Sequence, residues 1–193
     1  KSKSIGCDIC LYNKQYSIGG KDVCHNCDSS CKICNKTNGY CDECLEGYEY
    51  SENSKECNQC KEGLEYSLGG RNQCTKCDST CNNCHKFTGV CINCRPGFKK
   101  LKNSIKCEKC LEGYYSSDGN NNYCIPCDNS CLTCNNTNGQ CLTCEAGYEL
   151  YTYNDTVKCK SCPDNYFSVK GQNKCTACDN SCLTCDNTNG NCL

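Results

Sequence analysis

The stretch from Cys127 to Tyr148, CDNSCLTCNNTNGQCLTCEAGY, contains the pattern that decides the fold of this chain. Its closely spaced cysteines, its Asn-Gly pair and its Gly-Tyr pair recur along the sequence in a unit of about 50 residues. A complete unit reads C-x2-C-x13-C-x2-C-x3-C-x2-C-x6-C-x2-C. We therefore divide the chain into four repeats, the last of them partial: residues 1–56, 57–106, 107–158 and 159–193.

The composition leaves no room for an ordinary hydrophobic core. Of the 193 residues, 31 are cysteine, whereas Leu, Ile, Val and Phe together number only 25, and Met and Trp are absent. Chains with less than about 20% of these four apolar residues usually stay disordered, because burial does not offset the entropy of ordering the backbone. Covalent cross-links must replace the core. We expect a small disulfide-rich fold, an elongated tandem array of short β-hairpin modules with little or no helix.

Charge and motif content exclude several classes of function. The formal net charge is −1, and the 21 basic and 22 acidic residues are interspersed, which predicts no nucleic-acid partner. No apolar run is long enough for a membrane helix, so we expect no membrane insertion within this segment. No signal peptide is visible, and the sequence starts partway through its own pattern, as a fragment of a longer protein would. No Ser-His-Asp set, paired-carboxylate site or phosphate loop recurs, which predicts neither an enzyme nor a cofactor.

Turn signals keep the same register as the cysteines. A glycine lies two residues before the last doublet of each repeat, and in three repeats an asparagine precedes it: Asn38-Gly39, Asn138-Gly139 and Asn189-Gly190, with Gly89 in the second repeat. Asn-Gly is a strong hairpin-turn signal, because both residues tolerate positive φ. The pattern therefore predicts short hairpins, each pinned by cysteines.

These residues resemble a known family. The run C-x3-C-x2-C-x6-C-x2-C-x2-G-Y that begins at Cys127 is similar to the furin-like cysteine-rich repeat, found in proprotein convertases, R-spondins and the cysteine-rich domains of growth-factor receptors. The chain also resembles CxxC-rich surface proteins of ciliates and diplomonads. Its many asparagines, and its excess of Lys over Arg, are the bias of an AT-rich genome, as in many protists.

The resemblance implies a disulfide pattern, in which two-disulfide knots paired 1–3 and 2–4 alternate with hairpins closed by one bond. The implied knot pairs are Cys27–Cys34, Cys31–Cys41, Cys77–Cys84, Cys81–Cys91, Cys127–Cys134, Cys131–Cys141, Cys178–Cys185 and Cys182–Cys192. The implied hairpin pairs are Cys10–Cys24, Cys44–Cys57, Cys60–Cys74, Cys94–Cys107, Cys110–Cys124, Cys144–Cys159 and Cys162–Cys175. Cys7 remains, and its implied partner lies upstream of this segment.

Two other hypotheses account for the cysteines. C-x2-C followed after 13 residues by C-x2-C is also a spacing for four-thiolate zinc sites. The only two histidines, His25 and His85, occupy different repeat positions, although a ligand in a repeated site should repeat. Redox catalysis would need a helix N-terminus beside the doublet. Nothing in the sequence predicts that helix.

Three further features have alternative interpretations. The repeated Asp28, Asp78, Asp128 and Asp179, in C-D-x-[ST]-C, are either calcium ligands or side chains that close a tight turn. The tyrosines Tyr16, Tyr66 and Tyr115, each before a serine, either pack between modules or form an exposed adhesive surface. Asn35, Asn135 and Asn154 open N-x-T sequons, and in a secreted protein we expect N-linked glycan on at least one.

The sequence thus favours an extracellular structural repeat glycoprotein that forms a semi-rigid rod, coat or filament at a cell surface. Its expected partners are further copies of itself or other surface and matrix proteins. A receptor or ligand-binding cysteine-rich ectodomain is the alternative function. Accessory repeats of a secreted protease are a third.

Overall fold

The structure, a computed structural model, describes residues 10–18, 23–117 and 123–193. The described residues form twenty short strands and no helix, and so none that could cross a membrane. The strands of the first half are β1 (Gln15–Tyr16), β2 (His25–Asn26), β3 (Cys31–Cys34), β4 (Cys41–Cys44), β5 (Tyr48–Tyr50), β6 (Cys57–Gln59), β7 (Glu65–Tyr66), β8 (Thr75–Lys76), β9 (Cys81–Cys84) and β10 (Cys91–Cys94). Those of the second half are β11 (Phe98–Lys100), β12 (Cys107–Lys109), β13 (Tyr114–Tyr115), β14 (Ile125–Pro126), β15 (Cys131–Cys134), β16 (Cys141–Cys144), β17 (Tyr148–Tyr153), β18 (Thr156–Ser161), β19 (Tyr166–Phe167) and β20 (Thr176–Ala177).

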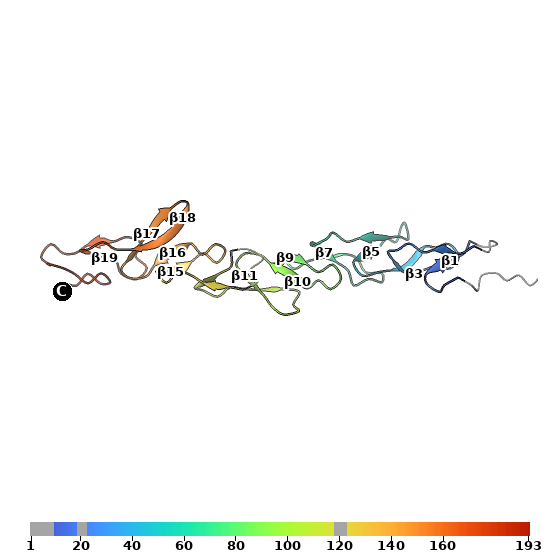
Figure 1. Ribbon diagram of the computed structural model, residues 1–193, viewed down its shortest axis with the longest axis horizontal. Coiled ribbons are helices and arrows are strands. Elements are labelled where there is room, and N and C mark those ends of the chain that lie inside the picture. Colours follow the sequence, from blue (N-terminus) through green and yellow to red (C-terminus); the bar gives the residue numbers. More distant parts are fainter. Residues whose placement is uncertain (1–9, 19–22, 118–122) are drawn as a thin grey trace, which may run out of the picture. The chain divides into compact units, whose positions relative to one another are not determined.

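Each strand pairs with its neighbour in sequence, so the described strands make ten two-stranded sheets, β1-β2 through β19-β20 (Figure 1). The hairpins inside the knots, such as β3-β4 and β15-β16, are interrupted by shifts of register. The hairpins between the knots, such as β5-β6 and β17-β18, pair without interruption. The architecture confirms the predicted small disulfide-rich array of tandem β-hairpins without helix.

Fifteen disulfides join the described cysteines, with Cα–Cα distances between 5.2 and 6.2 Å. They are the same fifteen pairs that the resemblance to furin-like repeats implies. Cys7 lies outside the described residues. A bond that closes a loop of about 15 residues stabilises by roughly 3 kcal/mol in the chain-entropy model, so a series of such loops can replace apolar burial.

The chain divides into two compact units, one formed by residues 1–92 and 103–106, the other by residues 93–102 and 107–193. In the first unit the buried centre consists of the knot cysteines Cys31, Cys34 and Cys41, the hairpin cysteine Cys44, which has no exposed surface, and Tyr50 at 3% exposure. In the second unit Leu150 packs against the knot cysteines, in the place that Tyr50 takes in the first. Cystines and single aromatic or aliphatic side chains thus form the cores.

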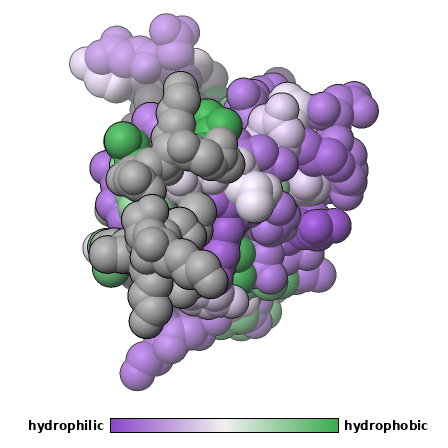
Figure 2. All heavy atoms as spheres, turned by 90° about the vertical axis from the view of Figure 1, so that its right-hand side faces the viewer, coloured by the Kyte–Doolittle hydropathy of each residue, from purple (hydrophilic) through white to green (hydrophobic). Residues whose placement is uncertain are grey.

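The hairpin that follows a knot is what buries it. Cys41 and Cys141 are each 3% exposed beneath the hairpins β5-β6 and β17-β18. The face drawn in Figure 2 is mostly hydrophilic, with small separate apolar patches. Stability therefore comes from contacts between neighbours, as in other repeat proteins.

Candidate functional site

The feature that recurs most completely is a joint between each hairpin and the next knot. Its first component is an aromatic ring that lies against the glycine of the knot loop. A Cβ atom added to Gly89 would stand 2.6 Å from Cζ of Tyr66, and φ of this glycine is +71°. The same ring-glycine pairs are Tyr16 with Gly39, Tyr115 with Gly139 and Phe167 with Gly190. Glycine is therefore required here both for its conformation and for the space it leaves.

The second component of the joint is the serine that follows the ring. Ser67 is 1% exposed; its N–H donates to the carbonyl of Lys86 (3.1 Å), and its own carbonyl accepts from the N–H of Gly47 (2.8 Å). One buried residue therefore ties three successive segments of the first unit together. In the second unit the corresponding bonds are Ser116 N to Asn136 O, Gly97 N to Ser116 O, Ser168 N to Asn187 O and Gly147 N to Ser168 O.

The joint decides between the two interpretations of the tyrosines. Tyr16, Tyr66 and Tyr115 are half-buried and pack between modules, as the first interpretation predicts. Other tyrosines are exposed, among them Tyr12 at 70% and Tyr153 at 65%. Tyrosines at one position of the repeat therefore pack between modules, whereas tyrosines at other positions are exposed to solvent.

A carboxylate that sequence reasoning missed links successive hairpins. Glu149 on β17 accepts a hydrogen bond from the backbone N–H of Cys175 (3.2 Å) in the next hairpin. This bond and an ion pair with Lys160 (3.2 Å) hold the pKa of Glu149 below its ordinary value. Glu49 makes the same bond to the N–H of Cys74. The recurrence of Tyr-Glu after the Gly of two repeats was the available signal.

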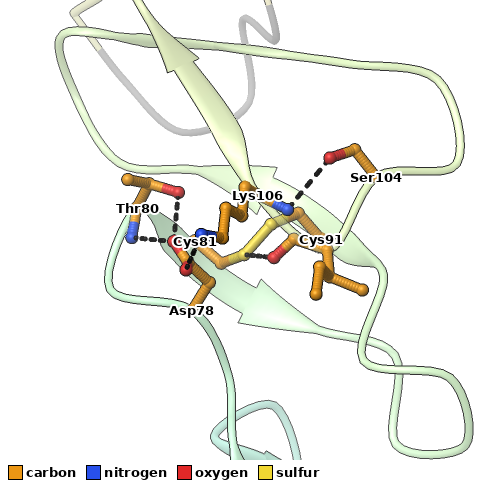
Figure 3. A network of polar contacts seen from close by, with 7 residues as sticks. Asp78, Thr80, Cys81, Cys91, Ser104 and Lys106 are labelled. Carbon is orange, nitrogen blue, oxygen red and sulfur yellow. Dashed lines mark hydrogen bonds and ion pairs between the residues drawn. A yellow bond between two sulfur atoms is a disulfide. The ribbon is translucent and has the colours of Figure 1, made fainter.

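The repeated aspartates close turns. The Oδ1 atom of Asp78 accepts from the backbone N–H (3.0 Å) and from the hydroxyl (2.6 Å) of Thr80, and its Oδ2 atom faces the Lys106 ammonium at 4.0 Å (Figure 3). The Thr80 hydroxyl and then its N–H lower the pKa of Asp78. Asp28, Asp128 and Asp179 bond the serine two residues on in the same way. This geometry favours the turn interpretation over a calcium ligand.

The sulfur atoms form clusters, but not those of the zinc hypothesis. The Sγ atoms of Cys31, Cys41 and Cys57 lie within 4.8 Å of one another, as do those of Cys131, Cys141 and Cys159. Each cluster joins a knot disulfide to a hairpin disulfide, rather than two doublets separated by 13 residues. Thiolates bind metals and disulfide sulfurs do not, so binding there would first require reduction of both bonds.

Two of the three sequons lie in knot loops, where the asparagine side chain closes a turn. The Oδ1 atom of Asn35 accepts from the N–H (3.0 Å) and hydroxyl (2.7 Å) of Thr37, and Asn135 does the same with Thr137. Asp186, which cannot carry an N-linked glycan, bonds Thr188 identically in the last repeat. The turn by itself explains why Asn-x-Thr recurs at this position.

The third sequon occupies a different environment. Asn154 is exposed at the tip of the β17-β18 hairpin, with φ of +46°, and Asp155 beside it has φ of +57°. Two successive residues of positive φ are typical of a tight hairpin turn. The side chain of Asn154 is therefore presented at the end of the longest hairpin of the described chain.

The first unit also contains a groove of about 400 Å³. Leu45, Leu68, Phe87 and Tyr48 line it together with the aliphatic and charged parts of Lys86. Leu45 is 40% and Leu68 is 64% exposed, so both present apolar surface to solvent.

The corresponding joint of the second unit is more polar. By repeat position, Glu145, Val169 and Thr188 replace Leu45, Leu68 and Phe87. There Glu145 forms an ion pair with Lys170 (3.5 Å). The joint thus folds with polar residues, so the apolar groove is not a requirement of the repeat.

No protein-family model matches this chain, and a search of curated proteins finds no similar sequence.

Proposed function

We propose that this chain is a structural repeat region of an extracellular glycoprotein, which serves as a semi-rigid spacer in a coat or filament at a cell surface. The observation that carries the proposal is the joint of ring, glycine and serine, which recurs in every repeat. A joint that fixes each hairpin against the next knot suits a spacer, which must keep a constant separation and orientation between the segments at its two ends. The proposal includes no enzymatic activity and no cofactor.

The chemistry of the cross-links supports the extracellular location. Fifteen disulfides in a chain with so few large apolar residues are stable where thiols are kept oxidised, and are rare in reducing compartments. A furin-like repeat region in a protist surface protein fits the same setting. N-linked glycan on a sequon would add polar bulk at an exposed asparagine such as Asn154.

The repetition of the sequence supports assembly. A contact between unlike surfaces of two copies propagates into a filament unless rotation closes it, and repeats offer the same surface several times. We therefore expect further copies of the chain, or other matrix proteins with matching surfaces, as partners.

The test uses the full chain secreted from a glycosylating cell. Negative-stain electron microscopy at increasing protein concentration should show regular filaments or sheets. The matched control is the variant Gly89→Ala/Gly139→Ala, which disturbs a joint in each unit and should leave isolated or irregular particles. Wild-type protein that stays monomeric at every concentration would contradict the proposal, as would free thiols in native material.

A second candidate function is ligand binding, and the groove in the first unit favours it. An extended peptide with apolar side chains and a carboxylate would match Leu45 and Phe87 and the neighbouring Lys86. The variant Leu45→Glu/Phe87→Thr carries the residues that the second unit has at these positions, so it should fold. Binding to an array of acidic-apolar peptides should fall at least tenfold in this variant, and equal binding by both proteins would remove the candidate.

A further inference from the structure

Three of the four knot loops contain an asparagine followed by glycine, the dipeptide in which an asparagine side chain reacts most readily with its own backbone. Glycine has no Cβ to hinder the approach of its nitrogen. The dipeptides are Asn38-Gly39, Asn138-Gly139 and Asn189-Gly190, and the second repeat has Thr88-Gly89 in the same place.

The reaction is deamidation, and it needs only water. The glycine nitrogen loses its proton and bonds to the carboxamide carbon of the asparagine, while the carbon–NH2 bond breaks and ammonia leaves. Water then opens the resulting five-membered succinimide to aspartate or isoaspartate. In isoaspartate the main chain runs through the former side chain and is one atom longer. The reaction begins only when the glycine nitrogen and the carboxamide carbon can meet.

In the folded knot loop, the glycine N–H and the asparagine carboxamide each form a hydrogen bond to a different residue, which keeps them apart. The N–H of Gly139 donates to the carbonyl of Asn135 (2.8 Å), and Oδ1 of Asn138 accepts from the N–H of Gln140 (3.1 Å). The matching bonds in the first repeat are Gly39 N to Asn35 O (2.9 Å) and Tyr40 N to Asn38 Oδ1 (3.0 Å). In the last repeat they are Gly190 N to Asp186 O (2.8 Å) and Asn191 N to Asn189 Oδ1 (2.9 Å).

Two further contacts keep the loop in this state. The ring of Tyr115 covers Gly139, and the disulfide Cys131–Cys141 closes the loop. The side chains of Asn38, Asn138 and Asn189 are nevertheless exposed. The loops are therefore protected by geometry and not by exclusion of water.

We propose that Asn38, Asn138 and Asn189 are latent deamidation sites, which the folded knots keep unreactive. They become reactive when an external thiol reduces the knot disulfides by thiol–disulfide exchange and is itself oxidised to a disulfide. The lengthened backbone of isoaspartate no longer fits a six-residue loop whose ends pair, as Asn135 N does with Gln140 O (2.9 Å). A knot in which isoaspartate forms while the loop is open cannot close again. Isoaspartate in one of these loops is therefore a permanent mark that the disulfides of that knot were once reduced.

The first experiment compares the full chain in its native state with the reduced and alkylated chain, both kept at mildly alkaline pH. Mass spectrometry of loop peptides follows the change of amide to carboxylate at each asparagine. We expect the native loops to react roughly thirtyfold more slowly, the factor that two ordinary hydrogen bonds supply. Equal rates in the two states would overturn the proposal.

The second experiment uses the repeats as controls for one another. Protein that is reduced, aged and reoxidised should recover the knot bond Cys81–Cys91 of the second repeat but lose Cys31–Cys41 and Cys131–Cys141, relative to protein reoxidised without ageing. Exchanging the residues, in the variants Thr88→Asn and Asn38→Thr, should exchange the behaviour of the first and second repeats. Knots that close equally well after ageing in all repeats would contradict the inference, without bearing on whether the chain assembles.

Discussion

The ring of Tyr66 lies directly over Gly89, so close that no side chain fits between them. This pair belongs to the joint that sets each hairpin against the following knot, and it has a counterpart in every repeat. Because the residues are 23 positions apart, the relation exists only in the folded chain. Its energetic weight can be measured by substitution.

Replacing Gly89 by alanine should destabilise the first unit by about 2–4 kcal/mol, because a strained positive φ adds to a clash with the ring. Gly113→Ala is the matched control, since its φ is +79° but no atom lies within 4 Å of the added Cβ. The control should lose only about 1–2 kcal/mol. Denaturant unfolding under non-reducing conditions measures both, and equal losses would show that the ring contact contributes nothing.

Acid should weaken the C-D-x-[ST]-C turns. Hydrogen bonds from Ser30 and Ser130 hold the pKa values of Asp28 and Asp128 below the ordinary value of 3.8. A carboxylate with a lowered folded-state pKa stabilises fully above its unfolded pKa, and this stability is lost as pH falls through the folded value. The thermal midpoint of unfolding should therefore decline as the pH falls below about 3.8, the ordinary pKa of an aspartate.

The control for this pH dependence is Asp28→Asn/Asp128→Asn, in which a neutral amide accepts the same hydrogen bonds. Asn35 makes that arrangement with Thr37 in the native chain. The variant should show a flatter decline of the midpoint in acid. A decline as steep as that of the wild type would place the acid sensitivity elsewhere.

Removal of the hairpin disulfide Cys44–Cys57, by alanine at both positions, should cost about 3 kcal/mol for a loop of this length. The buried Cys44 adds a packing loss, since it has no exposed surface. Removal of Cys182–Cys192, whose Cys192 is exposed, should cost less. Calorimetry of the two variants measures both losses. Nearly equal losses, as the similar sequence separations of 13 and 10 alone would give, would contradict a contribution from the burial of Cys44.

Glycan should be found at Asn154 when the chain is secreted from eukaryotic cells, because this side chain stands at an exposed hairpin tip. Mass spectrometry with Asn154→Gln as the control measures occupancy directly. Asn35 and Asn135, whose side chains close turns, serve as internal comparisons. An unmodified Asn154 in secreted protein would exclude the tip as the attachment site.

Much of the architecture could be predicted from cysteine spacing and composition. The x6 gap between Cys34 and Cys41, with Asn-Gly inside it, predicts a tight hairpin wherever it occurs. The roles of Asn35 and Asp28 were open in the sequence, because an amide or carboxylate near a serine or threonine suits a glycan, a metal or a turn. Only the hydrogen bonds of these side chains favour the turn.

The sequence by itself determined that cross-links replace a core and that hairpins follow one another, because both depend on residues close together along the chain. The tertiary structure alone decided that Tyr66 packs on Gly89, that Glu149 reaches Cys175, and that Leu45 and Phe87 share a groove. These contacts join separate modules, and no local propensity encodes the angle at which one hairpin meets the next.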